Sequence, residues 1–231
     1  MNWLLLIVIL FIGLSIVEGY RKGFIKTVFS IFGLAIALIV ASVGAPMLSH
    51  QLVKNETVYQ YIDKKVADTL DIDSRNLEQK EESAYIDKLP LPESIKNQIN
   101  ANNSFEVKSL LNVSNFSGYV SGYITCMILN AISYLLIVIL VLIAVRILAN
   151  LLDIISKLPV LNSINKIGGI AVGTLKGVII VWLFFVVITV FSGSEFGKSM
   201  FEMINDSVVL SYLYNNNLLM DIVLSVAKSL F

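Results

Sequence analysis

Long apolar stretches separated by shorter polar segments dominate the hydropathy pattern of this chain. Residues 3–17, 24–46, 119–145 and 167–191 have the apolar character of transmembrane helices. Irregular backbone is not stable in lipid, so these stretches predict helices rather than loops. We therefore expect an all-α integral membrane protein with four transmembrane helices in two hairpins. Pro46 is expected to end the second helix, because proline lacks the N–H that continues a helix.

Two polar segments lie outside the apolar stretches. Residues 49–117 form an insert in which the 3.6-residue period of an amphipathic helix covers residues 57–70. Weaker helical patterns follow at 76–88, 93–100 and 106–113. The insert has too few large apolar residues to hold a core alone, so we expect it to lie against the membrane or against another copy of the chain.

The remaining polar segment is an amphipathic C-terminal tail whose helical pattern is broken at Asn215, Asn216 and Asn217. The part of the tail from residue 218 onward is too short to span a membrane, so it predicts a surface-lying helix. The chain thus divides into a first transmembrane hairpin (1–48), an extracytoplasmic helical insert (49–117), a second hairpin with an amphipathic cytoplasmic connector at 146–157 (118–192), and the tail (193–231).

The short loops set the expected orientation. Their basic residues are Arg21, Lys22 and Lys26 in the first loop and Arg146, Lys157 and Lys166 in the second. Because positive loops stay in the cytoplasm, both loops are expected inside. Both termini and residues 49–117 are then extracytoplasmic, in a multi-pass protein of the bacterial cytoplasmic (inner) membrane.

Composition supports a membrane protein and excludes several classes of function. The chain is 56% hydrophobic and only 15% charged, with most acidic residues in the insert and a formal net charge of zero. No basic patch is dense enough for nucleic acid. The single cysteine, Cys126, rules out an intrachain disulfide or a cysteine metal site, and His50 is read as an interfacial residue. We expect no cofactor and no metal.

The small-residue faces are the first candidate sites. Gly33, Ala37 and Ala41 share one face of the second stretch. Because helices in lipid associate through such faces, we expect this one to pack against the glycines of the fourth stretch, which are Gly169, Gly173 and Gly177.

A polar turn between the first two stretches contains Arg21, Lys22 and Gly23. Glu18 precedes these basic residues by three and four positions, at which helical side chains pair, so we expect an interfacial ion pair.

The segment Gly19-x-x-Lys22-Gly23 recurs as Gly173-x-x-Lys176-Gly177, which suggests either two parallel copies of one hairpin or a chance recurrence. If the copies are equivalent, Lys176 lies at the cytoplasmic surface and residues 167–174 are an interfacial lead-in. Gly173 is then a surface-turn residue, and the membrane part is 178–192.

The third stretch carries a polar stripe of Cys126, Asn130 and Ser133 on one face. Such a stripe either bonds neighbouring helices or lines a path for a polar solute.

The chain resembles the colicin V production protein (CvpA) family over nearly its whole length. The resemblance rests on the Arg21-Lys22-Gly23-Phe24 turn, the second helix ending near Pro46, the Leu158-Pro159 connector, the Gly168-to-Gly177 run and the Tyr214–Asn217 stretch. It implies a bacterial inner-membrane protein linked to toxin production or export and to envelope physiology, and it supplies no catalytic residues.

No motif of a hydrolase, a P-loop or a paired Cys/His site occurs, so we expect no enzyme. The favoured interpretation is a non-catalytic membrane protein that supports toxin production, toxin export or envelope integrity. It would act through contacts with the lipid bilayer or with an envelope or export protein. The alternative is a homo-oligomeric channel or transporter component with a lumen lined by Asn130.

Overall fold

Every element in the described part of the chain is a helix. The structure, a computed structural model, describes residues 2–70, 79–151, 163–221, 223 and 224. In chain order the helices are α1 (Trp3–Lys54), α2 (Glu56–Leu70), α3 (Gln79–Lys88), α4 (Glu93–Ala101), α5 (Phe105–Leu110), α6 (Phe116–Leu151), α7 (Ser163–Val190), α8 (Glu195–Asn205) and α9 (Val208–Asn215). The expectation of an all-α fold is confirmed for these residues.

Three of the described helices, α1, α6 and α7, are long and apolar enough to cross a membrane. The first two expected spans both fall within α1, which is 52 residues long. Most of the outward side chains of these helices are apolar, as expected for surfaces that face lipid. These three helices thus have membrane-spanning character.

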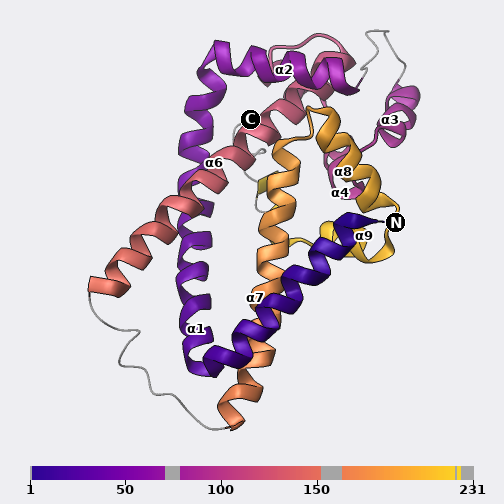
Figure 1. The fold of residues 1–231 in the computed structure, drawn as a ribbon. Coiled ribbons are helices and arrows are strands. Elements are labelled where there is room, and N and C mark those ends of the chain that lie inside the picture. Colours follow the sequence, from indigo (N-terminus) through magenta and orange to yellow (C-terminus); the bar gives the residue numbers. More distant parts are fainter. Residues whose placement is uncertain (1, 71–78, 152–162, 222, 225–231) are drawn as a thin grey trace.

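A bend at Gly23 divides α1 into two arms. Gly23 is the one non-helical residue inside α1, with φ 76° and ψ 172°, and the helix resumes directly after it. This backbone conformation is open essentially only to glycine, which explains why the bend falls there. Figure 1 shows the first arm running down to the bend and the second arm running back up. The expected polar turn is thus made by one non-helical residue. Each arm has enough residues to cross a bilayer as a helix.

The prediction that the second helix ends at Pro46 is wrong, because α1 continues through Pro46 to Lys54. Proline removes one backbone hydrogen bond but does not end a long helix whose neighbours hold it straight. Ala45 and Ser49, on either side of Pro46, are both buried against the rest of the protein. The tertiary contacts of this face therefore override the local preference of proline.

The helices expected in the insert are confirmed with small shifts in their ends. Residues 57–70 correspond to α2, and 93–100 correspond to α4. The weak pattern at 76–88 becomes α3, which begins at Gln79 in the described residues, and 106–113 becomes the short α5. The tail forms α8 and α9, with the expected break at its asparagines. Residues 152–157 of the connector and most of the tail beyond residue 221 lie outside the described residues.

The insert and the tail share one core with the first turns of α6. The Tyr119 hydroxyl donates to the Ile99 carbonyl at 2.6 Å, and the Ser94 amide donates to Asn215 Oδ1 at 3.1 Å. Thr69 of α2 donates to the Gly193 carbonyl at 3.0 Å. The insert therefore completes a core that it could not form alone, and this joint helical unit occupies the upper part of Figure 1.

Tyr214 anchors the tail at the end of α7. It is fully buried, its ring packs on Phe185 and Phe201, and its hydroxyl lies 2.7 Å from that of Thr189. Burial raises the pKa of the Tyr214 hydroxyl well above its ordinary value. The Asn217 amide donates to the Trp182 carbonyl, so the asparagine-rich break in the tail is fastened to α7.

Candidate functional site at the bend of α1

The glycines of α7 pack directly on the backbone of the first arm of α1. A Cβ atom placed on Gly173 would lie 2.5 Å from the Ser15 carbonyl oxygen, and one on Gly19 would lie 2.9 Å from Gly173 Cα. A Cβ atom on Gly177 would lie 3.1 Å from Ser15 Cβ and 3.2 Å from Ile12 Cα, a slightly looser contact. The two helices thus run antiparallel in backbone contact, which only residues without side chains allow.

The prediction of which helix face packs against these glycines is wrong. We predicted that they pack against Gly33, Ala37 and Ala41, but they lie on Ser15 and Gly19 of the first arm. Ala37 and Ala41 are buried, so their face does pack inside the protein. A Cβ on Gly33 would instead meet a methyl group of Val145 on α6, at 3.2 Å.

The interpretation of Gly173 as a surface-turn residue is also wrong. Residues 163–190 form one continuous helix, and Gly169, Gly173 and Gly177 are all buried within it. The two Gly-x-x-Lys-Gly segments therefore differ in conformation, since Gly23 bends the chain whereas Gly177 is helical. They are not copies of one local structure.

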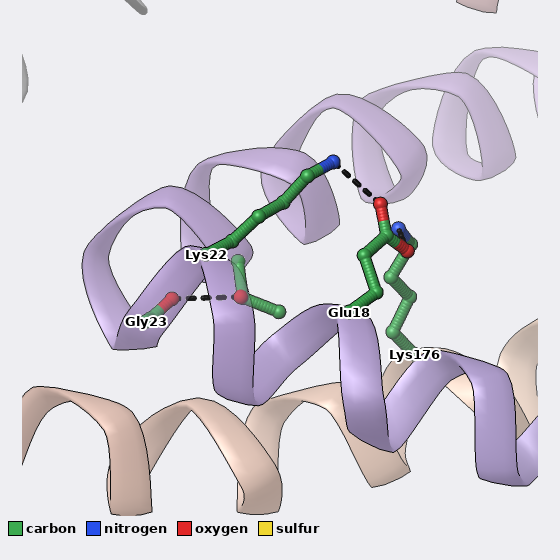
Figure 2. Close-up of polar contacts among 5 residues, drawn as sticks. Glu18, Lys22, Gly23 and Lys176 are labelled. Atoms are coloured by element: carbon green, nitrogen blue, oxygen red, sulfur yellow. Dashed lines mark hydrogen bonds and ion pairs between the residues drawn. The ribbon is translucent and has the colours of Figure 1, made fainter.

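Glu18 links the two lysines of these segments. Its Oε1 atom lies 2.5 Å from Lys22 Nζ, and its Oε2 atom lies 2.8 Å from Lys176 Nζ. Figure 2 shows the carboxylate between the two ammonium groups, beside the bend. The expected pair with Lys22 is present, and Lys176, placed among apolar residues of α7, obtains a partner from another helix.

Asn165, at the start of α7, holds the bend itself. Its Oδ1 atom accepts a hydrogen bond from the Ile25 amide at 3.3 Å, and its side chain fills the space that a Cβ on Gly23 would need. On the other side the Thr27 hydroxyl donates to the Gly23 carbonyl at 2.7 Å, a bond drawn at Gly23 in Figure 2. The bend and the start of α7 therefore form one unit.

Three residues of this site were not identified from the sequence: Ser15, Gly19 as a packing residue, and Asn165. Ser15, Gly19 and Gly23 recur every four positions, so the first arm carries its own small-residue face. That signal was visible, and it matches the spacing of the glycines on α7. Nothing in the local sequence indicates the role of Asn165.

The polar stripe of α6 is buried inside the chain. The Ser133 hydroxyl donates to the Leu129 carbonyl at 2.8 Å, one turn earlier in the same helix. Asn130 is 1% exposed, and its amide has no hydrogen-bond partner in the described part of the chain. Cys126 is buried as well. The stripe faces the interior of this chain and not an outer surface.

His50 lies on the exposed side of α1 near its end. In the described residues no three His, Cys, Asp or Glu side chains gather in a way that could hold a metal ion.

We expect the Glu18–Lys176 pair to couple more strongly than the Glu18–Lys22 pair. The Lys176 side chain is 14% exposed, whereas that of Lys22 is 48% exposed and is well solvated. Glu18→Gln should leave the Lys176 ammonium unpaired, and adding Lys176→Met should recover part of the loss. A double-mutant cycle on unfolding in mixed micelles should give a coupling of about 1–2 kcal/mol for Lys176 and below about 0.5 kcal/mol for Lys22. Equal couplings would show that the interhelical pair has no special role.

Together the long apolar helices, the glycine contact and the interhelical ion pair define an all-helical protein with helices of membrane-spanning character. The model of the colicin V production protein family matches residues 4–69 and 109–217, and the chain belongs to that family. The resemblance noted from the sequence is thus confirmed. The match covers the bend and the glycine contact and omits residues 70–108 of the insert. Neither the curated proteins nor the solved structures contain a match to the chain.

Proposed function

We propose that the protein is a non-catalytic component of the bacterial inner membrane that supports colicin V-like toxin production or export, or envelope integrity. It acts through contacts of its insert and tail with an envelope partner, protein or lipid. Family membership supports the link to toxin production. The joint unit of insert and tail supports a role in binding, because it is a packed body at one end of the helices.

In this proposal the two arms of α1 cross the membrane separately, giving four spans with α6 and α7. Figure 1 shows the first arm and α6 running one way, and the second arm and α7 running the other. The bend and the start of α7 carry exposed basic residues, Arg21, Lys22 and Lys166, so this end lies in the cytoplasm. Both termini and residues 49–117 then lie outside.

The observation that carries the binding role is the apolar face of α9. Val208 is 87% exposed and Tyr212 is 68% exposed, and Val209 lies beside them on the same face. On the opposite face Leu210 and Tyr214 are buried. No part of the described chain covers the exposed face. Other apolar side chains of the joint unit, such as Tyr61 and Phe105, are also exposed, but Val208, Val209 and Tyr212 lie together on one helix. An exposed apolar face of this kind is typical of a surface that meets a partner.

The alternative of an oligomeric channel or transporter component has less support. A lumen between copies would be lined by side chains on the outer surface of each chain. Asn130 and Ser133, the residues expected to line it, are instead buried within a single chain. A path through one chain would need more polar residues than these three long helices offer.

The test uses Val208→Ser/Tyr212→Ser in the full-length protein. Both side chains are exposed, so we expect unchanged membrane levels but a loss of toxin release or detergent resistance toward that of a deletion strain. Removing residues 57–106 would be uninformative, because the deletion would take buried side chains such as Val66, Ile95 and Ile99 out of the shared core. Tyr61→Ser on α2 is the matched control, because Tyr61 is also an exposed aromatic residue. A fully active double variant would rule out this face.

A further inference from the structure

Cations outnumber anions at the bend of α1. Residues 18–27 and the facing residues 163–177 of α7 contain one carboxylate, Glu18, against five basic side chains: Arg21, Lys22, Lys26, Lys166 and Lys176. These two segments are held together by Asn165 and by the glycine contact. The excess charge therefore belongs to one structural unit and not to two independent loops.

The single carboxylate does not neutralise the exposed cations. Glu18 already binds Lys22 and Lys176, one on each oxygen. Arg21 and Lys166 are exposed, and in the described part of the chain neither has a carboxylate partner. Lys166 lies 5.6 Å from the ring centre of Tyr20, which holds its ammonium group beside the first arm of α1. Two positive groups thus remain free to meet an anion.

The surface beside these cations combines apolar and charged side chains. A shallow hollow of about 420 Å³ runs along the first arm, lined by Leu14, Val17, Arg21 and Lys22 and by Glu18. The Glu18 carboxylate is already paired with Lys22 and Lys176, so it does not leave an unpaired negative charge in the hollow. Tyr20 and Phe24, both exposed aromatic residues, lie within the same turns of the chain. Aromatic side chains at this position are typical of the level of the lipid headgroups.

We propose that this surface is a binding site for an anionic phospholipid. The lipid phosphate lies between Arg21 and Lys166, and the upper part of an acyl chain lies along Leu14 and Val17. A soluble phosphate would use the cations but not the apolar side chains of Leu14 and Val17 in the same hollow, so the combination indicates a lipid. In Figure 1 the bend lies at the lower end of the first arm and α9 lies beside its upper end, so the site is separate from α9 and does not depend on the proposed function.

The experiment is native mass spectrometry of the full-length protein in detergent, titrated separately with phosphatidylglycerol and phosphatidylcholine. We expect phosphatidylglycerol to bind roughly 10-fold more tightly. Arg21→Gln/Lys166→Gln should remove this preference, and the single variant Arg21→Gln, which keeps Lys166 over Tyr20, should remove part of it. Lys64→Gln/Lys65→Gln is the matched control, because it makes the same change of charge at exposed residues of α2 and should leave the preference unchanged.

Two results would overturn the proposal. One is a double variant at Arg21 and Lys166 that keeps the preference of the wild type. The other is displacement of bound phosphatidylglycerol by millimolar inorganic phosphate, which would assign the site to a soluble anion. Retention of the lipid in phosphate together with its loss in the double variant would support the site as described.

Discussion

Gly169→Leu is expected to prevent α7 from packing on the first arm of α1. A Cβ at Gly169 would overlap the Gly19 carbonyl and would lie 3.0 Å from the Gly23 carbonyl carbon. These neighbours are backbone atoms of a helix, so they cannot rotate away as a flexible side chain would. The helices would have to separate, and the Glu18–Lys176 pair would separate with them.

The expected cost is above the usual range for an overpacked core. Added methylene groups typically cost about 1–3 kcal/mol when side chains can shift, and here both partners are backbone, so we expect more than about 3 kcal/mol. Equilibrium unfolding of the purified variant in mixed micelles measures this cost. A reduced level of folded protein in membranes should accompany it.

Gly13→Leu provides the matched control, because it makes the same change on the first arm of α1. A Cβ on Gly13 has no atom within 4 Å. The stability of the Gly13→Leu variant should therefore stay within about 1 kcal/mol of the wild type. If Gly169→Leu were as stable as Gly13→Leu, the contact between α1 and α7 would be looser than the structure shows.

Much of the fold could be predicted from hydropathy because long apolar segments have few stable alternatives in lipid. The helical nature of α1, α6 and α7 follows from this restriction alone. The amphipathic period likewise located α2 and α4 to within a residue at each end. The end of α1 could not be predicted, because the tendency of proline to end a helix is overridden at Pro46 by packing that the local sequence does not reveal.

The pairing of the helices could not be predicted in the same way. A face of small residues shows that a close neighbour is present, but several such faces compete for partners. Gly33 and Gly169 both lie on faces of small residues that could pack closely against another helix. The sequence does not show that the bend at Gly23 brings Ser15 and Gly19 against α7. The contact between Glu18 and Lys176 is a consequence of that pairing, so only Lys22, one turn away, could be identified as a partner.

The core of the insert was underestimated for a related reason. Counting large apolar residues within 49–117 treats the segment as if it folded alone. In the structure Ile95 and Ile99 are buried in one cluster with Tyr119 of α6 and Tyr214 of the tail. A core assembled from distant segments is not visible in the composition of any one of them.

Gly23→Ala is expected to have the second largest effect, because it acts on the bend that sets the pairing of the arms. At φ 76° and ψ 172° a residue with a Cβ is strained by about 1–3 kcal/mol, independently of its neighbours. The added methyl group would also collide with the Asn165 side chain. We therefore expect a loss of stability beyond the strain alone, with a changed accessibility of the first loop to cysteine labelling at position 22.

A second substitution separates the two causes. Asn165→Ala in the Gly23→Ala background removes the collision but leaves the strain, so the double variant should be more stable than the sum of the single effects predicts. Gly33→Ala is the control on the second arm, because its Cβ meets only a movable Val145 methyl group, and it should cost less than about 1 kcal/mol. If Gly23→Ala behaves like Gly33→Ala, residue 23 tolerates ordinary helical geometry, and the two arms of α1 then need no glycine to diverge. The outcome thus decides whether the bend is fixed by this residue or only by the helices packed around it.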